Sequence, residues 1–387
     1  MKGISRPLFL LTSIVRFSPI DKSTAFVRSN SITGHYSLGN NCSLFSSLRL
    51  SSSSHTLRMS SSSVDVVSFS SSLSTLRVAL CQFVVTQDKN MNENKAIDFL
   101  RRAKEQGATM AILPEIWNGP YATAAFREYA ELLPEVGDNL IDADKSKWSS
   151  SSASRMLMNA AKDLGIWIVG GSVSERVVTD KEDEEGNKIE KIYNTCLVLN
   201  PDGVVVAKHR KVHLFDIDVP GGITFFESET LSPGSTVSHF ESPYGKIGIG
   251  ICYDIRFAEY AMVLRQKHNC LVLIYPGAFN MTTGPAHWEL LQKARAIDNQ
   301  CFVVTASPAR SEEAVHDDDG EKKKYPHYTA WGHSTVISPW GDVIATTDEK
   351  EGIVLADLDL TRLEEVRKGI PIGDQRRTDM YALEDLS

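Results

Sequence analysis

The sequence has no long apolar run, no closely spaced pair of cysteines and no excess of basic residues. No segment reaches the roughly 20 apolar residues that cross a bilayer, so no membrane span is predicted. The six cysteines are scattered without a C-x-x-C pair, which favours free thiols in a reducing compartment. A formal net charge of −8 argues against a nucleic-acid partner. No G-x-G-x-x-G turn with a downstream acid and no Walker loop occur, so no nucleotide or flavin cofactor is expected.

Acidic residues are nearly absent from the first 64 positions. This segment holds seven Lys or Arg residues against a single acid, Asp21, and it is rich in serine, as in the runs 51–54 and 60–63. Such a composition is typical of an organelle transit peptide, and the serine content favours the plastid. We therefore expect residues 1–64 to be a disordered transit peptide that directs the chain to the chloroplast stroma. The alternative is a disordered tail that carries no targeting signal. A product whose translation starts at Met59 would stay in the cytosol.

Beyond residue 75, short apolar segments alternate with segments of helical periodicity, which predicts an α/β fold. The charged stretch 178–191 is expected to be a solvated loop, and Ser154 is the expected N-cap of a helix. Strands are expected at 77–84, 109–113, 166–169, 194–199, 204–208, 246–251, 271–275, 301–306, 334–337 and 343–345, and helices at 94–105, 154–164, 256–267 and 287–299.

The order strand, helix, strand over 77–113 recurs over 246–275. Two halves with matching order indicate an internal pseudo-repeat that builds one domain, rather than two independent domains. We place this domain at 75–365 and a C-terminal tail at 366–387.

A cysteine lies at one of the expected junctions between a strand and a helix. The apolar run 246–251 is short, rich in β-branched residues and preceded by the turn-like segment 242–245, so it reads as a buried strand. Cys252 follows it directly, where a side chain is presented sharply beside exposed backbone N–H groups. This geometry suits a thiolate nucleophile next to an oxyanion site, although a lone cysteine is more often a small buried core residue.

A cysteine that attacks an amide needs a base, an acid for the leaving ammonia, and positive charge at the oxyanion. No Cys-His-Asn pattern of the papain kind is visible, so a carboxylate and a cation are the candidates. Glu115 follows an apolar strand and a proline, and is either a base at the edge of a cleft or a surface acid. Lys211 is either a cation held beside Cys252 or a solvated surface lysine. His209 and His213 have a spacing that hints at metal, but no third ligand motif accompanies them and no metal is expected.

Three motifs follow one another along the chain: Leu113-Pro-Glu115, His209-Arg-Lys-Val-His-Leu214 and Gly250-Ile-Cys-Tyr-Asp-Ile-Arg256. Together they resemble the glutamate, lysine and cysteine triad of the nitrilase, or carbon–nitrogen hydrolase, superfamily over about residues 75–365. The resemblance implies Glu115 as proton acceptor, Lys211 as proton donor and oxyanion partner, and Cys252 as the nucleophile that forms a thioester. It also implies that Glu227 positions the substrate or the lysine, and that the N–H of Tyr253 joins the oxyanion site.

The implied fold is a four-layer α-β-β-α sandwich that pairs into a homodimer or a higher oligomer, with helix 256–267 in the interface. Further matches make the chain similar to the omega-amidase branch, which hydrolyses the terminal amide of 2-oxoglutaramate and 2-oxosuccinamate. These matches lie at 213–221, 223–228, 230–234, 275–280, 283–288 and 295–300. A small 2-oxo acid amide is therefore the expected substrate.

Three other functions are alternatives. A sibling branch that acts on deaminated glutathione has a cysteine motif close to 252–256, and another amidase of the nitrilase superfamily is the second alternative. The third is a catalytically idle scaffold, which would have no need of the full set of acidic, basic and thiol residues. An omega-amidase must also bind a substrate carboxylate, which needs a cation in an acidic protein. Arg256 and Arg295 are the candidates by position.

Overall fold

The computed structural model describes residues 74–139, 151–311 and 324–387, and the predicted transit peptide lies outside these described residues. One sheet comprises β1 (Thr75–Gln82), β2 (Met110–Ile112), β3 (Trp167–Val169), β4 (Val173–Glu182), β5 (Lys188–Leu199), β6 (Val205–Arg210) and β15 (Gly352–Asp359). A second comprises β9 (Ser238–Ser242), β10 (Gly245–Ile249), β11 (Val272–Pro276), β12 (Phe302–Ala306), β13 (Thr335–Ile337) and β14 (Val343–Thr346). The strands β7 (Asp216–Asp218) and β8 (Thr224–Phe226) form a separate pair.

Helices α1 (Lys89–Glu105), α3 (Ser152–Leu164), α4 (Ala258–Gln266) and α5 (Gly284–Asn299) flank the sheets. The other helical segments are α2 (Thr123–Phe126), α6 (Thr361–Gly369) and the 3₁₀ turns η1 (Glu227–Glu229) and η2 (Cys252–Arg256). The strand order is β15-β1-β2-β3-β5-β4 in the first sheet, with β6 paired to β5, and β14-β13-β12-β11-β10-β9 in the second.

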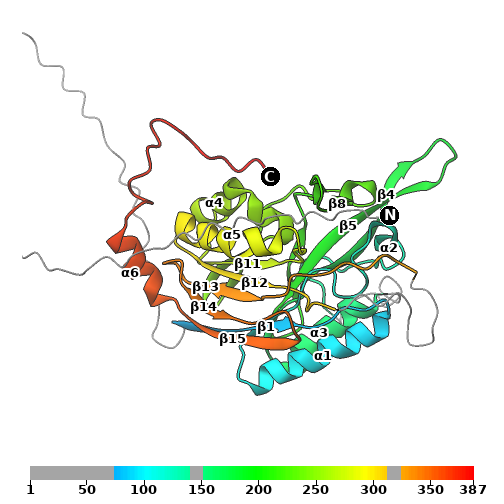
Figure 1. Ribbon diagram of the computed structural model, residues 1–387, viewed down its shortest axis with the longest axis horizontal. Coiled ribbons are helices and arrows are strands. Elements are labelled where there is room, and N and C mark those ends of the chain that lie inside the picture. Colours follow the sequence, from blue (N-terminus) through cyan, green and yellow to red (C-terminus); the bar gives the residue numbers. More distant parts are fainter. Residues whose placement is uncertain (1–73, 140–150, 312–323) are drawn as a thin grey trace, which may run out of the picture. The chain divides into compact units, whose positions relative to one another are not determined.

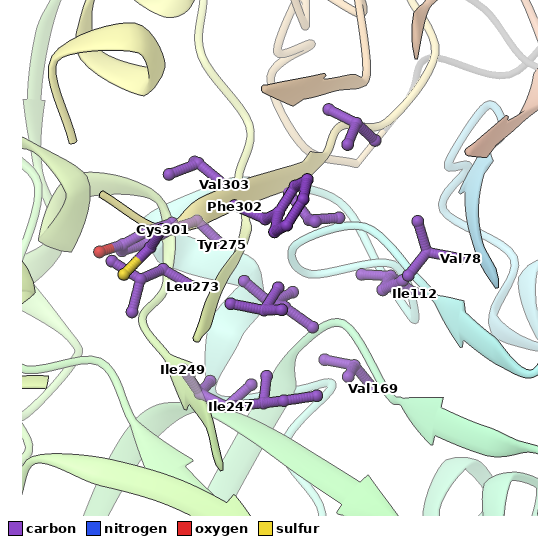
Figure 2. Close-up of a cluster of buried hydrophobic side chains, with 14 of the residues drawn as sticks. Val78, Ile112, Val169, Ile247, Ile249, Leu273, Tyr275, Cys301, Phe302 and Val303 are labelled. Atoms are coloured by element: carbon purple, nitrogen blue, oxygen red, sulfur yellow. The ribbon is translucent and has the colours of Figure 1, made fainter. Parts of the chain in front are cut away.

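The two sheets pack face to face between two layers of helices (Figure 1). Alternation along β1 shows how the sequence builds these layers, because successive side chains of a strand point to opposite faces. Val78 and Leu80 join the core between the sheets, whereas Ala79 and Cys81 join the core beneath α1 and α3. Figure 2 shows the core between the sheets, where side chains of both sheets meet: Val78, Ile112 and Val169 from the first, and Ile247, Ile249 and Phe302 from the second. The prediction of a four-layer α/β sandwich is confirmed.

The expected pseudo-repeat is visible in the topology. The strands β1, β2 and β3 run parallel and adjacent, and so do β10, β11 and β12, with α1 and α4 crossing between the first two strands of each set. Both middle strands lead into a proline, Pro114 after β2 and Pro276 at the end of β11. The backbone N–H of Ala278 donates to Glu115 at 2.8 Å, so the ends of these two strands meet.

The structure differs from the sequence expectations in several local details. The charged stretch 178–191 is not a loop, because most of it continues β4 and β5 as an exposed antiparallel ribbon that turns at Gly186. Ser154 is a buried residue inside α3, which begins after Ser151. The helix expected at 256–267 is α4, which begins only at Ala258, because Arg256 ends the 3₁₀ turn η2 and the chain is extended at Phe257. Helix α6 runs across the domain boundary predicted at residue 365.

Candidate active site

The cysteine elbow is formed by the end of β10 and the turn η2. Cys252 is buried and has a φ of 45°, a left-handed conformation that is uncommon for a residue with a side chain. Two glycines let neighbouring groups approach the strand that leads to it. A Cβ atom at Gly248 would lie 3.0 Å from Leu264 of α4, and one at Gly250 would lie 2.5 Å from the ring of Tyr275. The apolar run 246–251 therefore packs closely against its neighbours, and the strained Cys252 is held at its end.

Lys211 follows β6 and is fully buried. Its ammonium nitrogen lies 2.9 Å from an oxygen of Glu115 and 2.9 Å from an oxygen of Glu227. It also lies 3.4 Å from the hydroxyl oxygen of Tyr121. A buried ammonium is retained only where opposite charge and hydrogen bonds replace water, and two carboxylates do so here. Lys211 is thus no surface lysine.

Glu115 is buried in the loop after β2, so the alternative of a surface acid is wrong. One of its oxygens accepts hydrogen bonds from Lys211 and from the side-chain amide of Asn194 at 2.9 Å. The other accepts from the backbone N–H of Ala278. The Cys252 thiol lies near enough to this carboxylate for each group to affect the pKa of the other. These contacts fix Glu115 in a position to take the proton of the thiol.

The electrostatics of this cluster assign a charge state to each group. Burial raises the pKa of Glu115 despite the opposing Lys211 ammonium, which makes it a stronger base than a surface glutamate. Burial alone would lower the pKa of Lys211, but Glu115 and Glu227 outweigh it and raise this pKa well above its usual value. Burial, followed by the Glu115 charge, raises the pKa of the Cys252 thiol well above its usual value. The resting site therefore holds a thiol, a lysine cation and a base.

Glu227 fixes the lysine rather than the nucleophile. It is buried at the start of η1, where one oxygen accepts from Lys211 and from the hydroxyl of Tyr121 at 2.6 Å. Its other oxygen accepts the backbone N–H of Phe215 at 2.7 Å. Of the two roles implied for this glutamate, the geometry supports positioning of the lysine.

Three contacts of the cluster had no counterpart in the sequence analysis. Tyr121 follows Glu115 by six residues, and its place in the same loop was the one signal that pointed to it. Asn194 lies in β5, far away along the chain, and the contact of Ala278 is made by its backbone. Neither of the last two leaves a local signature in the sequence.

The two candidate arginines differ in how their guanidinium groups are used. Arg295 is buried and donates to the backbone carbonyls of Ile255 at 2.8 Å and Arg256 at 3.0 Å, with Asp298 at 3.3 Å. Arg256 lies over the ring of Phe279 at 4.9 Å, and none of the ion pairs among the described residues includes it. Arg295 therefore supports the elbow. The Nη1 atom of Arg256 lies 3.2 Å from Nδ1 of His287, but its Nε atom has no partner among the described residues and can donate to a ligand.

Tyr253 is the first residue after the nucleophile, and its ring contacts those of Phe215 and Phe257 at centroid distances of 5.3 and 5.6 Å. Its N–H belongs to the first turn of η2, where backbone donors lack partners within the turn itself. A pocket lined by Glu115, Tyr121, Ala278 and Tyr328 leads to this cluster from loops near residues 84–87, 308–311 and 326–330.

Two negative observations concern the described part of the chain. It contains no group of three or more His, Cys, Asp or Glu side chains arranged to hold a metal ion. None of its helices combines the length and the apolar character needed to cross a bilayer. His209 and His213, which had hinted at metal, both face the carboxylate of Asp254.

A buried glutamate, lysine and cysteine on a four-layer sandwich are the arrangement that the resemblance implied. The chain belongs to the carbon-nitrogen hydrolase family, whose model matches residues 77–368. It is 50% identical to omega-amidase NIT2 of Xenopus tropicalis over 309 residues, which cover 80% of this chain and 98% of the relative. It is 46% identical to omega-amidase NIT2 of Homo sapiens over 312 residues, 81% of this chain and 99% of the relative.

A solved structure supports the same family. Nit3 of Saccharomyces cerevisiae, described as a member of branch 10 of the nitrilase superfamily, superimposes with a TM-score of 0.64 at 37% sequence identity. The match covers 80% of this chain and 100% of that one. The expectation of a nitrilase-superfamily hydrolase is confirmed.

Proposed function

We propose that the chain is an omega-amidase that hydrolyses the terminal amide of 2-oxoglutaramate and 2-oxosuccinamate through a thioester on Cys252. The observation that carries this proposal is the buried cluster of Glu115, Lys211 and Glu227 beside the cysteine, in a chain about half identical to omega-amidases. The roles of the residues follow from the geometry of this cluster, and the two 2-oxo acid amides follow from the resemblance to the omega-amidase branch.

In the first half of the reaction, the Cys252 sulfur attacks the amide carbon while Glu115 takes the thiol proton. The carbonyl oxygen becomes an oxyanion, which the Lys211 ammonium and the N–H of Tyr253 stabilise. Because its pKa is raised so far, Lys211 is a poor proton donor. We therefore assign proton delivery to Glu115, which passes the thiol proton to the nitrogen as the C–N bond breaks and ammonia leaves.

In the second half, water attacks the thioester carbon and Glu115 removes a proton from it. The C–S bond breaks, the 2-oxo dicarboxylate leaves, and the Cys252 sulfur regains its proton. Lys211 keeps its charge throughout and meets an oxyanion in both halves. Glu115 thus acts first as base and then as acid in each half, and in the second half it returns the proton taken from water to the Cys252 sulfur. This suits a carboxyl group that is held in place by three hydrogen bonds.

We assign the substrate carboxylate to Arg256. Its charge acts on Cys252 and on Tyr328, which lines the pocket, and its Nε atom is buried without a partner among the described residues. The guanidinium of Arg295, in contrast, already donates hydrogen bonds to backbone carbonyls and to Asp298. A planar guanidinium can bind a carboxylate through two parallel hydrogen bonds, so Arg256 would hold one end of the substrate while the amide meets the nucleophile.

Plastid import, a cytosolic product from Met59 and assembly into a dimer through the helix region 256–267 belong to the proposal as well. Import is supported by the serine-rich and acid-poor composition of residues 1–64. Assembly is supported by the family resemblance.

The function is tested by ammonia release from 2-oxoglutaramate, 2-oxosuccinamate, deaminated glutathione and a short uncharged amide, with protein that starts near Val64. The proposal expects the highest kcat/KM for one of the two 2-oxo acid amides. A higher kcat/KM for deaminated glutathione would transfer the chain to the sibling activity, and absence of ammonia release from every amide would leave the idle scaffold.

A further inference from the structure

A fully buried aspartate, Asp254, lies two residues after the nucleophile and takes no part in the chemistry described above. Its Oδ2 atom accepts hydrogen bonds from the backbone N–H of Ile251 at 2.9 Å and from Nε2 of His209 at 3.1 Å. Its Oδ1 atom accepts from the backbone N–H of His213 at 2.9 Å and from Nδ1 of the same residue at 2.8 Å. Four donors therefore converge on one carboxylate.

These donors come from the two segments that carry the reacting groups. Ile251 immediately precedes Cys252, whereas His209 and His213 flank Lys211 two residues away on either side. The residues that Asp254 joins on the lysine segment are 41 to 45 positions away along the chain. A single side chain thus binds the cysteine segment to the lysine segment.

Both imidazoles are themselves held in place. Nδ1 of His209 lies 3.0 Å from the hydroxyl oxygen of Ser238, and the ring of His213 stacks on Phe257 with centroids 3.6 Å apart and planes 11° apart. Although burial raises it, hydrogen bonds from the two histidines lower the pKa of Asp254 well below its usual value. The carboxylate is therefore ionised, and each imidazole nitrogen that faces it carries a proton.

The elbow needs such support, because Cys252 has the left-handed conformation described above. That conformation is unfavourable for a residue with a side chain, and it persists only where the surrounding structure fixes it. The bond from Ile251 to the Asp254 carboxylate is matched by one from the Asp254 N–H to the Ile251 carbonyl at 3.0 Å. The two bonds close the turn around the cysteine.

We propose that Asp254 is a positioning residue, which fixes the Cys252 sulfur relative to the Lys211 ammonium by holding both segments without touching the substrate. The inference rests on the roles proposed for these two residues and not on the identity of the amide. Because Asp254 fixes the distance between the Lys211 charge and the Cys252 sulfur, its loss should change the reactivity of the free thiol as well as turnover.

The test uses Asp254→Asn, which keeps the size of the side chain but turns one acceptor into a donor that faces other donors. A displacement of about 1 Å between reacting groups costs roughly a hundredfold in rate, so kcat should fall by about that factor. KM should change by less than about threefold, because substrate binding is not altered. Alkylation of Cys252 by iodoacetamide at neutral pH should also slow, since the thiolate loses part of the lysine's stabilising charge.

The matched control is Glu175→Gln. Glu175 is another buried carboxylate that holds β6, through bonds of 2.7 and 2.8 Å to the guanidinium of Arg210, but none of its contacts reaches the elbow. This variant should lower the Tm and leave kcat and the alkylation rate near those of the wild type. His213→Ala removes one side-chain donor from a half-buried position and keeps the fold, so it should shift kcat and alkylation in the same direction as Asp254→Asn by smaller factors.

Wild-type kcat and alkylation in Asp254→Asn would overturn the proposal. Equal losses of both quantities in Asp254→Asn and Glu175→Gln would overturn it too, because the aspartate would then act on general stability. If Asp254→Asn does not fold, His213→Ala decides, and unchanged kcat and alkylation in that variant contradict the proposal. If the wild type hydrolyses none of the tested amides but Asp254→Asn is still alkylated more slowly than the wild type, the proposed substrate is refuted and the role of Asp254 is supported.

Discussion

Replacement of Lys211 by methionine tests the electrostatic part of the account. Methionine has a similar length and fills the same space, but it removes the only cation that the structure places between Glu115 and Glu227 among the described residues. The oxyanion then loses its charged partner, and the loss of one preorganised oxyanion partner costs about a hundredfold or more in kcat. We expect that loss in steady-state ammonia release from 2-oxoglutaramate.

The same variant should lose stability in a pH-dependent way. Removal of one partner from a buried ion pair costs about 3 kcal/mol, because the remaining charge stays buried. The Lys211 ammonium lowers the pKa of Glu115, so its removal raises that pKa further above the value in the unfolded chain. A carboxyl group with a raised pKa favours the folded state below its unfolded pKa, and this contribution is lost as the pH rises through the folded pKa. The deficit in unfolding free energy should therefore grow as the pH rises above the pKa that Glu115 has in the folded wild type, and should stay constant at more acidic pH.

Lys208→Met is the matched control for this prediction. Lys208 is a nearly buried lysine of β6 that also binds two carboxylates, Glu175 at 2.7 Å and Glu135 at 2.8 Å. Its loss should destabilise the protein without a large change in kcat. Near-wild-type turnover in Lys211→Met, or equal losses of turnover in the two variants, would refute the role assigned to Lys211.

Four further results are expected. Cys252→Ala should abolish hydrolysis and leave the fold intact, as seen by circular dichroism, and Cys252→Ser should be nearly inactive because a hydroxyl is harder to deprotonate than a thiol; substantial turnover by the alanine variant would exclude Cys252 as nucleophile. Glu115→Gln should lower kcat at least about a hundredfold, and a smaller loss would point to another base. Arg256→Lys should raise KM for 2-oxoglutaramate far more than for a short uncharged amide, whereas Arg295→Lys should lower the Tm without that discrimination; equal effects of Arg256→Lys on both amides would show that it does not bind the carboxylate. A fluorescent reporter fused after residue 64 should enter plastids and one fused to a product from Met59 should stay in the cytosol, and an exclusively cytosolic full-length fusion would contradict the transit peptide.

Much of the fold was predictable because local sequence patterns mark its strands and helices. The apolar runs around β1, β2, β10, β11 and β12 are short and bounded by turn residues, and the recurrence of strand, helix and strand indicated the pseudo-repeat. The ribbon of β4 and β5 was missed because its residues are charged, and its strand character comes from cross-strand pairing rather than from burial. Ser154 satisfied the composition of an N-cap, but the helix begins after Ser151, which is the same residue type.

In the candidate site, too, local motifs predicted some residues and tertiary contacts determine the others. Motifs around Glu115, Lys211 and Cys252 marked segments that the fold brings together, and the contacts at 2.9 Å confirm the proximity of the glutamate and the lysine. The contributions of Asn194 and the backbone of Ala278 depend on how separate strand ends meet, which no local pattern expresses.

The most direct test of the account is a rapid-quench experiment on full-length protein mixed with 2-oxoglutaramate. Ammonia release and the mass of the peptide that contains Cys252 are measured at the same time points. We expect an initial release of ammonia together with an acyl group on Cys252 that disappears during turnover, and a longer-lived acyl group in Glu115→Gln. Ammonia release without any acylated Cys252 peptide in either protein would contradict the thioester route.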